Sequence, residues 1–69
     1  MPIIIVNLLT GRDQAKKSAL IRELADAAVR ALDVPLASVR VVLNEVPPEH
    51  WGIGNETKAS QNAKAKEGQ

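Results

Sequence analysis

The stretch Ile3-Ile4-Ile5-Val6-Asn7-Leu8-Leu9 decides the fold of this chain. It is rich in β-branched residues, whose side chains fit a pleated strand. Both alternating sets of positions are largely apolar, which is typical of a strand covered on its two faces. The sequence Thr10-Gly11-Arg12 then interrupts the apolar run. Residues 3–9 are therefore predicted to form a β-strand with both faces covered.

A long amphipathic helix is predicted to follow this strand, over residues 14–32. Asp13 is the expected N-cap, because its carboxylate can accept hydrogen bonds from the free amides of the first turn. Pro35 ends the helix, since the residue before a proline avoids the α region. Apolar residues follow the three- and four-residue spacing of a buried stripe and widen it to about half of the circumference. They are Leu20, Ile21, Leu24, Ala25, Ala27, Ala28, Val29, Ala31 and Leu32.

A second strand is predicted over residues 38–46, where it is stopped by Pro47-Pro48. Glycines at positions 52 and 54 indicate a turn that leads into a short hairpin. Residues 58–69 form a polar tail, which we expect to be loosely ordered or to depend on a neighbouring chain. The predicted fold is α+β, a single domain over residues 1–69 built on one β-α-β unit. Its two strands should be parallel, with a right-handed crossover.

The size of the chain predicts assembly. It has 69 residues, of which 45% are hydrophobic. Domains below about 70–80 residues usually need a disulfide, a metal or oligomerisation for stability. The chain has no cysteine and its single histidine is His50, so neither a disulfide nor a structural zinc site is expected. We expect a second chain to continue the two-stranded sheet, which alone is marginal in water. The same chain would cover the surplus apolar arc of the helix.

Charge and hydropathy argue against several classes of partner. The net charge of +1 gives no general attraction to nucleic acid or to an anionic membrane. No apolar run approaches the roughly 18 residues of a membrane span, and the short N-terminal run lacks the features of a signal peptide. No phosphate-binding loop is present. We therefore expect a cytoplasmic protein without a cofactor.

Pro2 is the most distinctive candidate for chemistry. A small second residue usually allows the initiator Met1 to be removed, so we expect Pro2 to become the N-terminus. A free N-terminal proline is a secondary amine, whereas with Met1 attached its nitrogen is an amide without basicity. An ordinary α-amino group has a pKa of about 8. A modest environmental change therefore makes this nitrogen a usable base near neutral pH.

Arg40, Arg12 and Trp51 are the other candidates. A guanidinium is a forked donor suited to carboxylates, which points to an anionic substrate. Arg40 lies among valines, and a charge in such a strand requires a partner or a function. The structural alternatives are an ion pair across a subunit boundary for Arg40 and a solvated loop residue for Arg12. Trp51, the only aromatic residue, is either an apolar wall beside the base or an ordinary packing anchor. His50 is expected at the surface.

Together these features resemble the 4-oxalocrotonate tautomerase family. The resemblance runs without gaps from Pro2 to about Glu56. It rests on segments that occur in register, namely Pro2, Gly11-Arg12, Leu20-Ile21-Arg22-Glu23, Ser38-Val39-Arg40-Val41 and Trp51-Gly52-Ile53-Gly54. The resemblance implies β-α-β chains that pair into four-stranded sheets and assemble as trimers of dimers. A homohexamer is expected, and a heterohexamer with a second kind of chain is the alternative.

The resemblance also implies a mechanism. Pro2 would act as the general base that moves a proton within a 2-hydroxymuconate-like or phenylenolpyruvate-like enol acid, as in the catabolism of aromatic compounds. Arg40 would bind the carboxylate and the 2-oxygen, and Arg12 would hold the far carboxylate of a dicarboxylate. Both arginines are expected from neighbouring chains. The family archetype has phenylalanine in place of Trp51 and a basic C-terminus in place of the polar tail.

Two other functions remain open on the sequence. Related proteins hydrate or dehalogenate haloacrylates, or decarboxylate semialdehydes, with the proline protonated and acting as an acid. Such reactions generally use an added carboxylate, and neither Glu45 nor Glu49 has a recognisable setting for that role. The second alternative is a non-catalytic assembly subunit, which is favoured if Met1 is retained.

Overall fold

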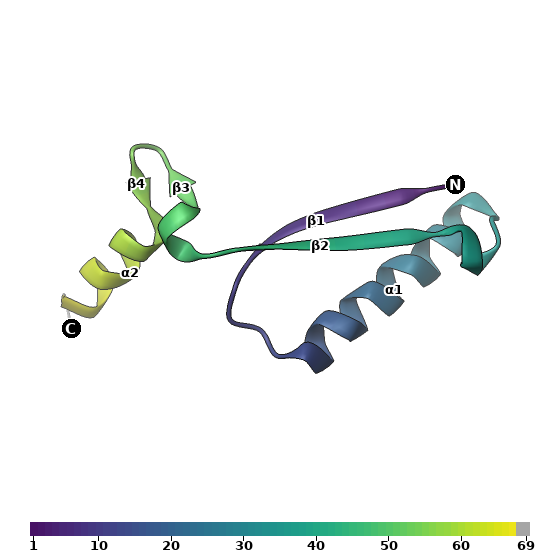
Figure 1. Cartoon of the computed structure of the whole chain (residues 1–69), viewed down its shortest axis with the longest axis horizontal. Helices are drawn as coiled ribbons and strands as arrows, with labels where there is room; N and C mark the ends of the chain where they lie inside the picture. The colour runs from purple at the N-terminus through teal and green to yellow at the C-terminus, as the bar shows by residue number, and fades with distance from the viewer. Residues whose placement is uncertain (68–69) are drawn as a thin grey trace.

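A computed structural model describes residues 1–67 of the chain (Figure 1). Strand β1 (Ile3–Leu9), helix α1 (Gln14–Leu32) and strand β2 (Arg40–Val46) form the predicted β-α-β unit. The two strands are parallel and pair in register from Ile3 with Arg40 to Leu9 with Val46. Strand β2 begins two residues later than predicted, because Leu36–Ser38 form a short 3-10 helix, η1.

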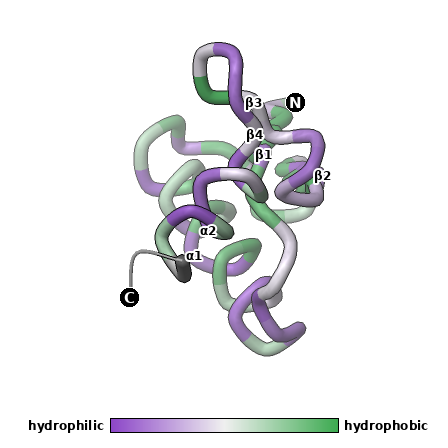
Figure 2. Tube along the Cα trace, turned by 90° about the vertical axis from the view of Figure 1, so that its left-hand side faces the viewer, coloured by the Kyte–Doolittle hydropathy of each residue, from purple (hydrophilic) through white to green (hydrophobic). Residues whose placement is uncertain are grey.

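Both ends of α1 are capped by aspartates. The carboxylate of Asp13 accepts a 2.9 Å hydrogen bond from the main-chain N–H of Lys16, as the sequence predicts. At the other end Asp33 adopts a left-handed conformation with φ of 56°, and its N–H donates to the carbonyl of Val29 at 2.9 Å. Figure 2 shows hydrophobic and hydrophilic residues alternating around the helical turns. The amphipathic helix therefore has the predicted length and limits.

The two faces of the β1–β2 sheet differ in how they are covered. Lys17 of α1 pairs with Glu45 at 2.7 Å, and Glu45 is the register partner of Leu8. This face therefore lies under α1, and Leu8 is the only buried hydrophobic residue in the described part of the chain. On the other face, called the open face below, Ile3, Ile5 and Val42 are 63%, 61% and 45% exposed. One chain thus covers only one of the two faces that the sequence predicts to be covered.

The C-terminal part of the chain forms an arm, residues 48–67, that projects away from the β-α-β unit (Figure 1). The arm contains the 3-10 helix η2 (Pro48–His50), the hairpin strands β3 (Gly52–Ile53) and β4 (Glu56–Thr57), and helix α2 (Lys58–Glu67). The hairpin confirms the prediction from the glycines. The radius of gyration is 16.2 Å, against about 11 Å for a compact domain of this length. The chain is therefore far more extended than an independently folded domain.

Residues 58–67 of the predicted tail form α2, so the expectation of loose order is wrong there, whereas dependence on a neighbouring chain stays a prediction. The physical reason is local. The hydroxyl of Thr57 accepts a 3.0 Å hydrogen bond from the N–H of Ser60 and so caps the helix. The alanines, lysines and glutamine that follow are all strong helix formers. Residues 68–69 of the predicted tail lie outside the described residues.

Candidate active site

Pro2 lies immediately before β1 and is half-buried. Its carbonyl accepts a 3.0 Å hydrogen bond from the main-chain N–H of Arg40, the first residue of β2. The parallel pairing of the two strands therefore brings Pro2 and Arg40 to the same end of the sheet. This contact fixes the main chain on one side of the proline ring.

The side chain of Arg40 is exposed and is held by carbonyl groups of its own chain. Its Nη1 donates to the carbonyls of Ala37 at 2.7 Å and Val39 at 3.2 Å. A guanidinium has five N–H donors, and these two bonds occupy only one of its terminal nitrogens. Arg40 is also the register partner of Ile3 on the open face. The guanidinium is thus oriented by η1 and presented on the side of the sheet that α1 does not cover.

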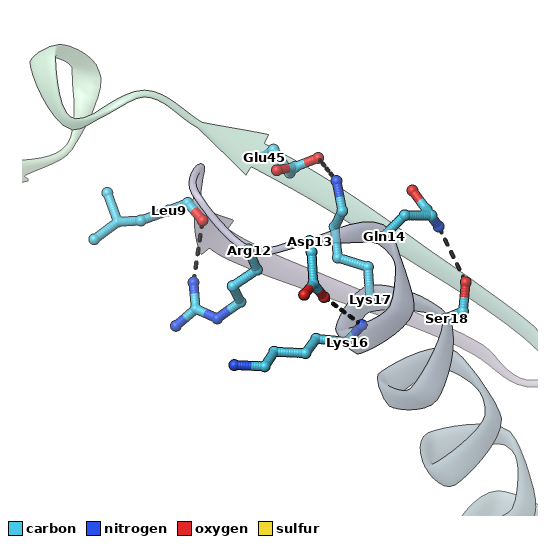
Figure 3. Close-up of polar contacts among 8 residues, drawn as sticks. All are labelled: Leu9, Arg12, Asp13, Gln14, Lys16, Lys17, Ser18 and Glu45. Carbon is cyan, nitrogen blue, oxygen red and sulfur yellow. Dashed lines mark hydrogen bonds and ion pairs between the residues drawn. The ribbon is translucent and has the colours of Figure 1, made fainter.

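Arg12 lies at the opposite end of the sheet. It follows Gly11, whose φ of 124° favours glycine, and its Nη1 donates to the carbonyl of Leu9 at 3.1 Å (Figure 3). Strand β1 separates it from Pro2, and seven strand residues span about 20 Å. Arg12 is exposed. Within one chain it therefore does not reach Pro2.

Neighbouring contacts hold the segment after Arg12 in place (Figure 3). The Nζ of Lys17 donates to Glu45 at 2.7 Å, and the amide of Gln14 donates to the hydroxyl of Ser18 at 3.1 Å. The Lys17–Glu45 pair joins residues that are 28 positions apart. No local sequence pattern predicts such a pair, although the parallel topology places the start of α1 beside the end of β2.

Trp51 belongs to the C-terminal arm and is half-buried. Its main-chain N–H donates to the carbonyl of Pro48 at 3.3 Å, and its main-chain carbonyl accepts from the main-chain N–H of Lys58 at 2.7 Å. The arm leaves the sheet after Val46, the end of β2 that lies near Arg12 rather than Pro2. His50 is exposed, as the sequence predicts.

The four predicted site residues therefore fall into two groups in a single chain. Pro2 and Arg40 lie at one end of the sheet, whereas Arg12 and Trp51 lie toward the other. Residues 1–67 of one chain enclose no pocket at either end. They also contain no group of three His, Cys, Asp or Glu side chains placed to hold a metal ion, and no helix long and apolar enough to cross a bilayer. Any site that combines the two groups has to form between chains.

The sequence did not indicate the ion pair between Glu56 of β4 and Lys64 of α2. The hydrogen bond and the charge of Lys64 hold the pKa of the Glu56 carboxyl below its ordinary value, and a hydrogen bond from Gln61 adds to this effect. The signal that could have revealed the pair is Thr57, an N-cap residue directly before a run of helix formers.

Three comparisons place the chain among known proteins. The family model described as "Tautomerase enzyme" matches residues 2–61. A 2-hydroxymuconate tautomerase from Stutzerimonas stutzeri is 49% identical over 57 residues, which cover 83% of this chain and 90% of that protein.

Two solved structures have the same fold. One is from work on the 4-oxalocrotonate tautomerase isozymes of Methylibium petroleiphilum, with a TM-score of 0.88 and 38% identity over 91% of this chain and 98% of the other. The second belongs to a heterohexameric 4-oxalocrotonate tautomerase from Chloroflexus aurantiacus J-10-fl, with a TM-score of 0.81 and 44% identity over 86% and 95% of the two chains. This chain therefore belongs to the tautomerase family and is an isomerase of that family.

Proposed function

We propose that this tautomerase moves a proton within an enol or dienol acid, with the free nitrogen of Pro2 as the general base. The observation that carries the proposal is the position of Pro2, which heads β1 and is the first residue matched by the family model. Removal of Met1 converts its amide nitrogen into a secondary amine. This nitrogen accepts the 2-hydroxyl proton of a dienol acid, and the conjugated double bonds shift. The same nitrogen then returns a proton to a distant carbon, so one O–H bond is exchanged for one C–H bond.

The two arginines bind the negative charges of this substrate. Arg40 holds the carboxylate and the 2-oxygen, where charge develops as the hydroxyl proton leaves. Positive charge at that oxygen lowers the barrier, because the oxyanion forms beside a donor that is already oriented. Arg12 holds the second carboxylate of a dicarboxylic acid. Cations near the Pro2 amine also disfavour its protonated form and lower its pKa.

The active unit in this proposal is an assembly of identical chains, a hexamer built from three dimers. The exposure of Ile3, Ile5 and Val42 supports it, since an open apolar face favours association. The separation of Arg12 from Pro2 supports it too, because a second chain then has to supply Arg12. Arg40 lies on the open face, so it too can enter the site of a neighbouring chain. One solved relative is a heterohexamer, so a mixed assembly is the alternative.

The substrate class follows from the relatives and the arginines. A relative at 49% identity is named 2-hydroxymuconate tautomerase, and a pair of arginines suits a compound with two carboxylates. We infer a 2-hydroxymuconate-like dienol acid of aromatic catabolism, converted in the cytoplasm, with Trp51 as an apolar wall of the site.

An ultraviolet assay with purified chain tests this function. The substrates are 2-hydroxymuconate and a monocarboxylic enol acid, and the variant is Pro2→Ala. Pro2→Ala replaces the secondary amine with a primary amine that the pyrrolidine ring no longer holds in place, so kcat/KM should fall by up to about 10²–10⁴-fold while size-exclusion chromatography shows an unchanged assembly. Wild-type turnover by Pro2→Ala would reject the role of the proline secondary amine. A kcat/KM that falls as the pH rises through the pKa of Pro2 would instead indicate an acid role, as in the hydratases and decarboxylases.

A further inference from the structure

Helix α2 is attached directly to the main chain of Trp51. The N–H of Lys58, the first residue of α2, donates to the carbonyl of Trp51 at 2.7 Å. The next residue, Gly52, pairs with Thr57 across the hairpin, and Thr57 caps α2 through its hydroxyl. Trp51, the hairpin and the start of α2 therefore form one hydrogen-bonded unit.

The Glu56–Lys64 ion pair adds a side-chain contact between the hairpin and α2. Glu56 lies on β4, and Lys64 lies within α2. The Glu56 and Lys64 side chains are 35% and 63% exposed, so solvent weakens the pair. An exposed ion pair shifts an equilibrium by about 1.4- to 5-fold. That range is enough to adjust the order of α2 without determining whether the chain folds.

One residue of this ion pair, Lys64, lies outside the segment that the family model matches. The family model matches residues 2–61, whereas α2 continues to Glu67. Lys64 is therefore in an extension that follows the matched segment. Glu56 lies within that segment, two residues before Lys58, the first residue of α2. The pair thus connects the hairpin to a part of α2 that lies beyond the matched residues.

We propose that Glu56 and Lys64 are positioning residues that fix Trp51 through α2 and thereby determine which enol acids the site accepts. The inference rests on the proposed function, in which Trp51 forms an apolar wall beside the substrate. In the proposed function Pro2 and Arg40 carry out the proton transfer, and neither residue belongs to the arm. Loosening α2 should therefore change the fit of the substrate and leave proton transfer nearly unchanged.

The chain provides its own optical probe for this test. Trp51 is the only tryptophan, and there is no tyrosine or phenylalanine, so all intrinsic aromatic fluorescence comes from this residue. Lys64→Gln removes the charge, whereas Lys64→Arg keeps it as the matched control. The double variant Glu56→Lys/Lys64→Glu swaps the two charges and so restores an ion pair between the same positions. A chain ending at Gln61 removes the extension entirely.

In Lys64→Gln and in the shortened chain, acrylamide quenching of Trp51 should rise, and KM for the dicarboxylate should rise by about 1.4- to 5-fold with little change in kcat. Lys64→Arg and the double variant should resemble the wild type. Unchanged quenching in both disrupted chains would overturn the positioning role. Changed quenching with unchanged KM for every enol acid would overturn the role in specificity. If the wild type converts no enol acid, the proposed function fails, while the quenching comparison still decides whether the pair fixes Trp51.

Discussion

The main-chain N–H of Arg40 donates a 3.0 Å hydrogen bond to the carbonyl of Pro2. This bond continues the parallel pairing of β1 and β2 by one step beyond Ile3. It ties the proposed base to the strand that carries the proposed oxyanion-binding arginine. The position of the Pro2 nitrogen therefore depends on correct pairing of the sheet, and loss of that pairing should abolish activity.

Arg40→Ala should lower kcat by about 10²–10³-fold, because it removes a donor that stabilises the developing charge. Arg40→Lys keeps the charge but not the forked geometry, so it should recover only part of the activity. Steady-state kinetics on 2-hydroxymuconate checks both variants, with Arg22→Gln on α1 as the control for loss of an exposed arginine. Wild-type kcat in Arg40→Ala would contradict the assignment.

Arg12→Ala should affect binding more than turnover. A hydrogen bond to a charged group contributes about 1.5–3 kcal/mol, so KM for a dicarboxylate should rise by about 10- to 100-fold. KM for a monocarboxylic enol acid should change little, because that substrate has no second carboxylate for Arg12 to hold. Equal affinity of the variant and the wild type for the dicarboxylate would exclude this role.

Mixed assemblies test whether Pro2 and Arg12 of one site come from different chains. Pro2→Ala and Arg12→Ala chains should each be impaired alone. After joint unfolding and refolding at equal amounts, roughly one quarter of the sites should regain both intact residues by random pairing of chains. Recovery of dicarboxylate turnover would be measured against each variant refolded alone. No recovery in assemblies shown by mass spectrometry to be mixed would place both residues in one chain.

The limits of sequence prediction follow from which interactions are local. Residues 3–9 and 14–32 were predicted with the observed limits, because strand propensity, the Asp13 cap and helical periodicity are all encoded within the segment itself. The second strand was extended two residues too far, since the η1 turn competes with pairing there. The tail was misjudged because its polarity outweighed the cap at Thr57.

The candidate site shows the same division. The residue types at Pro2, Arg12, Arg40 and Trp51 could be singled out from the sequence, and the predicted strand over residues 3–9 already separates Arg12 from Pro2. The register adds that Arg40 lies at the Pro2 end of the sheet in its own chain. Long-range contacts such as Lys17–Glu45 depend on the same register.

The open face should be essential for assembly. Ile5 is 61% exposed in one chain, so Ile5→Glu should change the folding stability of a single chain little. An unpaired charge buried between chains is, however, strongly unfavourable for assembly. Sedimentation velocity of Ile5→Glu should show species smaller than the wild-type assembly. The activity of the variant should fall in proportion to the loss of the full assembly. Arg22→Glu, an exposed change on α1, is the matched control and should leave the assembly intact. An Ile5→Glu chain that still forms the wild-type assembly would show that this face is not the interface.

The central claim is that the Pro2 nitrogen acts as a free amine. The most direct measurement compares two preparations of the same sequence, one with Met1 removed and one with Met1 retained, each verified by intact mass and matched for assembly state. Chains that begin at Pro2 should convert 2-hydroxymuconate, whereas chains that retain Met1 should lose about 10²–10⁴-fold in kcat/KM. Equal turnover by both preparations would contradict the account.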